Sequence, residues 1–241
     1  GAVVDEADPF ATDAALDMYD ERNGFCIPPG SSKYDAEWLS RYRKAQRARA
    51  ARIDAIARRH LEEAANARAT VREPEFGAKP AAYRSYMSRR MMAPRMMIIY
   101  RTQANPNYTD LSLDPSERLV GSILGGRPDL ANYHVFGLGR VMTPDAWLST
   151  WSGLSSYARL ERNLPKVTVP TLVVGAMGDQ DIFLSDVRSE YEQSGAADKR
   201  LEFIEGADHF MRAGGTRRNL GDPRPRLMKV LTEWARERFG P

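Results

Sequence analysis

Apolar residues in the last third of the chain form short continuous runs that alternate with segments of helical spacing. Residues 167–175 are almost entirely apolar, as expected for a parallel strand covered on both faces. The pattern then predicts a helix over 186–194, a second strand over 201–204 and a terminal amphipathic helix over 226–239. This alternation of strands and helices predicts an α/β sheet with right-handed crossovers.

The middle of the chain has a pattern that is typical of helices. Residues 32–69 contain neither proline nor glycine and are rich in alanine and arginine, which are strong helix formers. We therefore predict one long amphipathic helix, introduced by a capping box that begins at Ser32. A further helix is expected after Thr143, with Pro144 at its first position.

The first residues form a short apolar run, Ala2 to Val4, that predicts a buried strand leading into a loop. A chain that opens in a core strand is expected to continue a longer structure. We predict three regions: a core strand and loop over 1–22, a helical cap or lid over 23–165, and an α/β core over 166–241.

Composition narrows the class of protein. Of the 241 residues, 42% are hydrophobic and 28% are charged, which is ordinary for a globular protein. The net charge of +3 is weak evidence for a polyanionic partner, and the basic residues between Arg41 and Arg68 accompany no recognised nucleic-acid motif. No apolar stretch has the length of a membrane span. We therefore expect neither a nucleic acid nor a membrane as partner.

The single cysteine, Cys26, excludes an internal disulfide framework and favours a reducing compartment, so a cytoplasmic location is expected. One cysteine and three scattered histidines do not supply a metal-ligand set, and we expect no metal and no cofactor. His60 falls on the long helix, where a structural or surface role is expected. His134 falls in an aromatic loop, where packing is favoured and a place in the lining of a pocket is the alternative.

Chemistry-bearing residues follow the two predicted strands. Asp179 and Asp181 come after the first strand, and His209 comes after the second. A histidine can take a proton from a nucleophile and return it to a leaving group, while a carboxylate fixes its tautomer and stabilises the imidazolium. We predict His209 and Asp179 as catalytic residues. The spacing from Gly175 favours Asp179 as the acid, and Asp181 remains the alternative.

Methionine and tryptophan residues of the middle region are candidates for substrate contacts. Met91 and Met92 lie in a methionine-rich stretch, and Trp147 and Trp151 lie on the helix predicted after Thr143. Methionine adapts to varied apolar shapes, so these side chains could line a pocket for a hydrophobic substrate. Packing within a helical layer is an equally open interpretation.

Two segments resemble motifs of the α/β-hydrolases. Residues 170–179, P-T-L-V-V-G-A-M-G-D, are similar to the strand that precedes the triad acid, and residues 206–210, G-A-D-H-F, resemble the histidine loop. Trp234 and Phe239 suit the closing helix of that family. The resemblance covers 165–241. It implies the carboxy-terminal part of an α/β-hydrolase sheet with a large, mainly helical cap insertion.

The sequence departs from the family pattern at the nucleophile. Family members carry it on a G-x-S-x-G turn between a strand and a helix, and this motif occurs nowhere in the 241 residues. The nearest segments have the wrong spacing or lack the preceding strand. They are Gly24-Phe25-Cys26, Gly30-Ser31-Ser32, Gly121-Ser122-Ile123-Leu124-Gly125 and Gly153-Leu154-Ser155.

Two functions follow from the resemblance. The favoured one is a subunit or cleaved fragment of a serine-type hydrolase, acting on a carboxylic ester of a hydrophobic small molecule. It would form a heterodimer with an amino-terminal chain that carries the nucleophile and the oxyanion hole. A cysteine or aspartate nucleophile, the latter as in haloalkane dehalogenases, stays open. The alternative is a catalytically inactive, hydrolase-like binding or scaffold protein.

Overall fold

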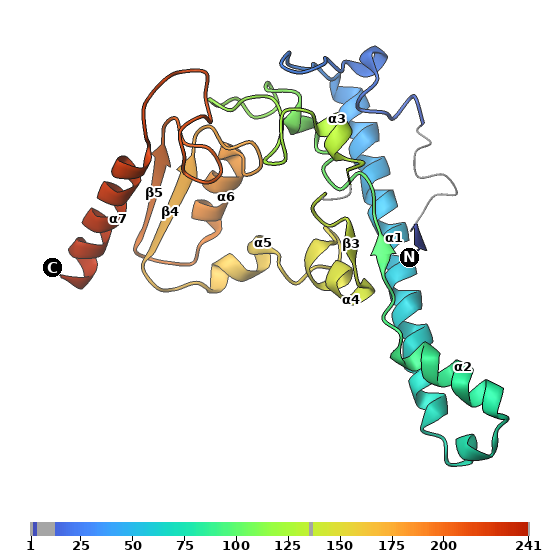
Figure 1. The fold of residues 1–241 in the computed structure, drawn as a ribbon. Helices are drawn as coiled ribbons and strands as arrows, with labels where there is room; N and C mark the ends of the chain where they lie inside the picture. The colour runs from blue at the N-terminus through green and yellow to red at the C-terminus, as the bar shows by residue number, and fades with distance from the viewer. Residues whose placement is uncertain (1, 4–12, 135–136, 241) are drawn as a thin grey trace. The chain divides into compact units, whose positions relative to one another are not determined.

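The computed structural model describes residues 2–3, 13–134 and 137–240, which form two compact units (Figure 1). Unit 1 contains the short strand β1 with Leu39–Thr102 and residues 137–158, and unit 2 contains Ala14–Trp38, Gln103–His134 and residues 159–240. Val4 and the loop predicted after it lie outside the described residues. No helix of the described ranges is long and apolar enough to cross a membrane.

The long helix predicted in the middle of the chain is α1, Ala36–Val71. The predicted capping box at Ser32 is wrong, because the side chain that caps the helix is Asp35. Its carboxylate accepts hydrogen bonds from the backbone N–H groups of Glu37 (2.9 Å) and Trp38 (3.1 Å). The Ser32 hydroxyl instead accepts from the backbone N–H of Cys26 at 3.0 Å.

The core of unit 1 forms where α1 meets a small sheet. The strands β1 (Ala2–Val3), β2 (Met97–Ile98) and β3 (Val141–Met142) lie in the order β1-β2-β3, with β1 parallel and β3 antiparallel to β2. The helix α2, Ala81–Met92, contributes no buried residue. The core residues come from α1, from β2 and the residue after it, and from β3 and the π-helical turn Trp147–Trp151: Ile53, Ala57, Met97, Ile99, Met142 and Trp147.

The α/β part of unit 2 is a pair of parallel strands with two helices (Figure 1). The strands β4 (Thr171–Ala176) and β5 (Lys199–Ile204) pair along their whole length. The helix α6, Leu184–Gln193, connects them, and α7, Arg224–Phe239, follows β5. Among the described residues no further strand joins β4 and β5, so an α/β-hydrolase sheet remains a prediction.

The strand predicted from residue 167 begins later, at Thr171. Pro170 has no backbone N–H for the ladder, and the preceding residues Leu164–Lys166 form a 3₁₀ turn. The remaining helices are short: α3 (Pro128–Ala131), α4 (Pro144–Ala146) with a π-helical turn (Trp147–Trp151), α5 (Leu160–Asn163), and 3₁₀ turns at Glu21–Asn23, Pro74–Ala78 and Pro106–Tyr108.

The region predicted as a cap, 23–165, is divided between the two units. Its segments 23–38 and 103–134 belong to unit 2, where backbone hydrogen bonds attach one to the other and to the sheet. The Ser32 N–H donates to the Thr109 carbonyl at 2.9 Å, and the Glu117 N–H donates to the Met177 carbonyl at 3.1 Å. Loops of unit 2 therefore surround the end of β4 from which Asp179 extends.

Candidate functional site: a buried acid and a histidine at the ends of β4 and β5

Asp179 lies in the turn that follows β4 and is 7% exposed. Its Oδ1 accepts hydrogen bonds from the backbone N–H groups of Asp181 at 2.8 Å and Ile182 at 3.1 Å. Its own N–H donates to the Ala176 carbonyl at 3.3 Å. These bonds compensate the burial of the carboxylate and fix its orientation.

His209 lies in the loop after β5, with its Nδ1 3.1 Å from Oδ1 and 3.0 Å from Oδ2 of Asp179. The side chain keeps 30% of its surface exposed. The ring of Phe210 contacts it edge-on, with the centroids 5.1 Å apart. The histidine is therefore held on one side of its ring and open on the other.

The two loops meet because β4 and β5 are parallel and end level with each other. Ala176 pairs with Ile204 at the ends of the strands, and the Gly178 N–H donates to the Ala207 carbonyl at 3.0 Å. Only glycine fits at position 178, because a Cβ there would lie 2.4 Å from the carbonyl oxygen of Gly215. This close approach brings the acid loop against the histidine loop.

A short hairpin presents the histidine. Ala207 and Ala213 form a β-bridge at its base, and the Asp208 N–H donates to the Arg212 carbonyl at 2.9 Å. The Asp208 carboxylate accepts from the backbone N–H groups of Phe210 and Arg212, both at 2.8 Å. The loop therefore has its own hydrogen-bond network, which holds His209 near its tip.

Asp181, the alternative acid, has other partners. Its Oδ2 accepts from the Ile123 N–H at 2.5 Å, and it interacts with the hydroxyl of Tyr108. Burial raises the pKa of Asp181, against the effect of the Ile123 and Tyr108 hydrogen bonds, which favour the charged form. In this structure the carboxylate at hydrogen-bond distance from His209 belongs to Asp179.

The arrangement suits a general base. When His209 donates its Nδ1–H to Asp179, Nε2 is the unprotonated nitrogen and can accept a proton from a nucleophile. No hydrogen bond to Nε2 occurs within residues 13–134 and 137–240. The serines and the cysteine of the nearest nucleophile-like segments bond elsewhere. Ser122 is 1% exposed and donates to Gln103, Ser155 donates to the Leu148 carbonyl, and Cys26 is exposed, with Sγ 3.8 Å from the Ile27 carbonyl.

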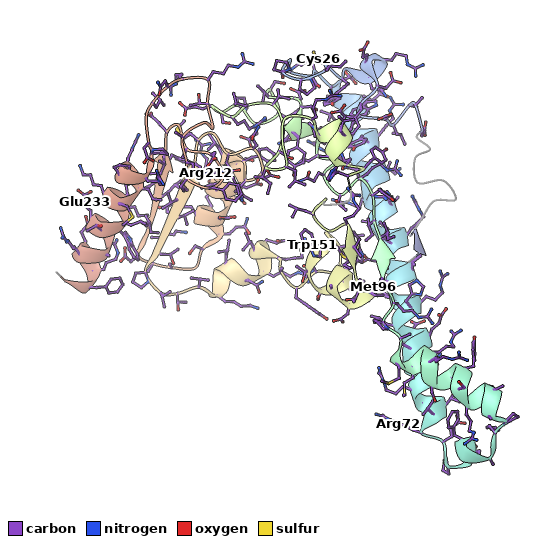
Figure 2. All side chains as sticks on the ribbon, viewed as in Figure 1. Cys26, Arg72, Met96, Trp151, Arg212 and Glu233 are labelled. Atoms are coloured by element: carbon purple, nitrogen blue, oxygen red, sulfur yellow. The ribbon has the colours of Figure 1, made fainter. Side chains whose placement is uncertain are left out.

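The four predicted substrate contacts belong to unit 1. Trp147 is only 7% exposed, and its indole N–H donates to Asp54 at 2.7 Å, so it packs in the core. Met92 is 74% exposed and Met91 is half-buried. Trp151, which is labelled in Figure 2, is 46% exposed. Contact of these side chains with a substrate remains a prediction.

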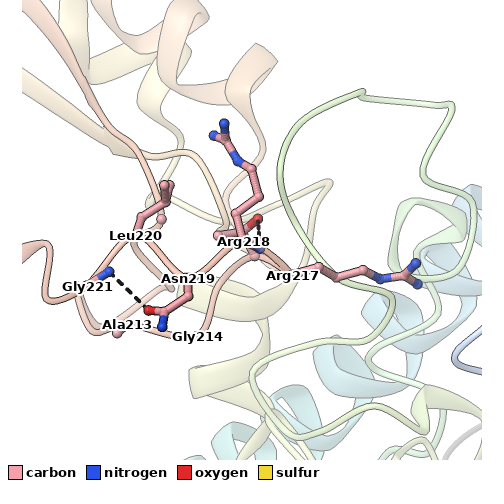
Figure 3. A pocket seen from close by; sticks show the side chains of 9 residues that line it. Ala213, Gly214, Arg217, Arg218, Asn219, Leu220 and Gly221 are labelled. Carbon is pink, nitrogen blue, oxygen red and sulfur yellow. Dashed lines mark hydrogen bonds between the residues drawn. The ribbon is translucent and has the colours of Figure 1, made fainter.

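The loop that follows the histidine hairpin lines a pocket of about 220 Å³, which was not predicted from the sequence (Figure 3). Arg217 and Arg218 extend from it in different directions, and Arg218 forms an ion pair with Glu117. The one signal in the sequence is the clustering of small and polar residues. The lining residues are Gly206, Ala213, Gly214, Thr216, Arg217, Arg218, Asn219, Leu220 and Gly221.

Sequence reasoning also missed the residues that support the acid loop. Gln180 donates to the carbonyls of Leu119 and Val120, both at 3.2 Å, and Glu117 accepts from the Gly206 N–H at 2.9 Å.

The described residues contain no group of three or more His, Cys, Asp or Glu placed to hold a metal ion. Comparisons with protein-family models, with curated proteins and with solved structures found no match.

Proposed function

We propose that this chain supplies the histidine and the acid of an α/β-hydrolase-type ester hydrolase. The nucleophile and the oxyanion hole would come from an amino-terminal chain, with which it forms a heterodimer. The observation that carries the proposal is the pair of contacts between His209 Nδ1 and the Asp179 carboxylate, at 3.1 and 3.0 Å. These 241 residues contain no G-x-S-x-G segment, so the proposal places the nucleophile outside them.

In the proposed acylation step, Nε2 of His209 takes the proton of the nucleophile's hydroxyl as its oxygen attacks the ester carbonyl carbon. The imidazolium is stabilised by Asp179, which stays ionised. The proton then passes from Nε2 to the alkoxy oxygen, the C–O bond breaks and the alcohol leaves. In the second half, His209 takes a proton from water as the water oxygen attacks the acyl carbon. The bond between the acyl carbon and the nucleophile's oxygen then breaks, the carboxylic acid leaves, and the proton passes from Nε2 to the nucleophile's oxygen.

The surroundings of the pair favour this chemistry. Asp179 is buried and accepts two backbone N–H bonds in addition to its contact with the histidine, so its carboxylate has hydrogen-bond donors without a cationic side chain. His209 is partly open, which a base needs to reach a nucleophile. The methionine-rich sequence of residues 80–100 is the reason to expect a hydrophobic acyl or alcohol group.

The experiment uses native material that contains this chain and its partner. Mass spectrometry should show a second polypeptide in the complex, and a fluorophosphonate probe should label a serine of that polypeptide. Hydrolysis of p-nitrophenyl esters of increasing acyl length should accompany the labelling. A complex that hydrolyses the esters but is not labelled by the fluorophosphonate would overturn the serine assignment and favour a cysteine or aspartate nucleophile.

Substitution of His209 tests the role of this chain directly. His209→Ala should abolish both fluorophosphonate labelling and ester hydrolysis, because it removes the proposed base. The matched control is His60→Ala, on the long helix α1. Unchanged turnover in His209→Ala, or a fully stable chain that co-purifies with no partner and hydrolyses no ester, would favour the inactive binding or scaffold protein.

A further inference from the structure

Asp181 lies two residues from Asp179, yet its carboxylate contacts a different part of unit 2. The Ile123 N–H donates to Oδ2 at 2.5 Å, and the Tyr108 hydroxyl interacts with the same carboxylate. The ring of Tyr108 contacts that of Phe183, with centroids 6.1 Å apart. The Asp181 side chain is thus anchored to two segments that are distant from it in the sequence.

These contacts belong to a larger attachment between residues 117–123 and the acid loop, 177–181. The Glu117 N–H donates to the Met177 carbonyl at 3.1 Å, and the Gln180 side chain donates to the carbonyls of Leu119 and Val120. The Tyr108 carbonyl in turn accepts from the Gly121 N–H at 2.8 Å. Each of these bonds fixes the path of the 117–123 segment along the acid loop.

The same segment reaches the histidine loop. Glu117 accepts from the Gly206 N–H at 2.9 Å and forms an ion pair with Arg218. One segment therefore contacts the loop that carries Asp179 and the loop that carries His209. A shift of this segment would change the separation of the two loops.

The backbone N–H of Asp181 connects its side chain to the catalytic pair. The Asp181 N–H donates to Oδ1 of Asp179 at 2.8 Å, and the same oxygen lies 3.1 Å from His209 Nδ1. Anchoring the Asp181 carboxylate fixes the direction of its N–H. That N–H, together with the N–H of Ile182, sets the orientation of the Asp179 carboxylate.

We infer that Asp181 is a positioning residue, which together with Tyr108 and the Ile123 N–H holds Asp179 in line with His209. The expected effect of Asp181 on turnover rests on the proposed function. The contact between Asp179 and His209, which Asp181 would position, lies within this chain. The negative charge of Asp181 faces Tyr108, Asp179 and His209. Burial raises the pKa of Asp181, and the hydrogen bonds from Ile123 and Tyr108 oppose that shift only in part, so the charged carboxylate stays in the loop at a cost.

The test compares two replacements of similar size. Asp181→Asn keeps an oxygen that can accept from the Ile123 N–H, whereas Asp181→Leu keeps none. A histidine Nδ1–H that is bonded to a carboxylate gives a low-field proton signal in NMR spectra. We expect this His209 signal to persist in Asp181→Asn and to be lost to fast exchange in Asp181→Leu. Tyr108→Phe, which keeps the ring and removes only the hydroxyl, should broaden the low-field signal of His209.

In the assembled enzyme, Asp181→Leu should lower kcat about 10- to 100-fold with KM unchanged, the range seen when supporting hydrogen bonds of an active site are removed. Asp181→Asn should restore most of the turnover. An unchanged low-field signal in folded Asp181→Leu would overturn the inference. Full activity of His209→Ala would overturn the proposed function instead, and the NMR comparison would still decide the role of Asp181.

Discussion

Asp179 and His209 extend from loops after two adjacent parallel strands, and Nδ1 of the histidine lies 3.0 Å from Oδ2 of the aspartate. The carboxylate is 7% exposed and the imidazole side chain 30% exposed. A buried acid that orients a partly open histidine is the arrangement that a general base requires.

Replacing the acid should affect turnover more than folding. Asp179→Asn keeps the shape of the side chain and can still accept from the N–H groups of Asp181 and Ile182. It cannot stabilise the imidazolium, so kcat for ester hydrolysis in the assembled enzyme should fall on the order of 10⁴-fold. Steady-state kinetics checks this. Asp198→Asn, which removes an exposed carboxylate paired with Arg238, is the control and should leave kcat unchanged.

Local sequence patterns predict many of the helices and strands. The helix at Leu184–Gln193 and the strand at Lys199–Ile204 lie within two residues of the ranges read from the sequence, because apolar spacing and breakers act locally. The meeting of Asp179 with His209 could also be predicted, since parallel strands end at the same edge of a sheet.

Contacts between distant segments could not be predicted in this way. The apolar pattern marks Trp147 as a candidate pocket residue, but its burial depends on an indole N–H bond to Asp54, far away on α1. The partners of Asp181 are likewise a loop N–H at Ile123 and a hydroxyl at Tyr108. Loop segments between breakers give no periodic signal, so their docking onto the acid loop appears only in the tertiary structure.

The turn at Gly121 should be intolerant of a side chain. Gly121 has a φ of +125°, and a Cβ there would lie 2.7 Å from the Gly125 carbonyl oxygen and 3.2 Å from Nε2 of Gln180. Backbone strain of this kind costs about 1–3 kcal/mol, so Gly121→Ala should lower the free energy of unfolding by about that amount or more. Urea unfolding measures it. Gly153→Ala, which has no atom within 4 Å of the new Cβ, is the control, and equal midpoints for the two variants would contradict the prediction.

The hydrogen bond between Trp147 and Asp54 should stabilise unit 1. The indole Nε1–H donates to Oδ1 of Asp54 at 2.7 Å, and Asp54 is 7% exposed. Trp147→Phe keeps an aromatic ring but leaves a buried carboxylate oxygen without this donor, at a cost of about 1–3 kcal/mol. Thermal or urea unfolding of the variant checks the loss. Trp151→Phe, at a position that is 46% exposed, should change stability by less, and the reverse order would contradict the packing role.

Tyr108 should make stability depend on pH in the alkaline range. Burial, and after it the negative charge of Asp181, raises the pKa of Tyr108 in the folded protein above the ordinary tyrosine value of 10.0. The unfolded chain therefore loses this proton first, and the folded state binds more protons above pH 10. The contribution of Tyr108 is complete below that pH and is lost as the pH rises further. Tyr108→Phe should flatten the fall in unfolding free energy above pH 10, which urea unfolding at a series of pH values measures. Parallel slopes for the variant and the parent chain would show that Tyr108 ionises equally in the folded and unfolded states.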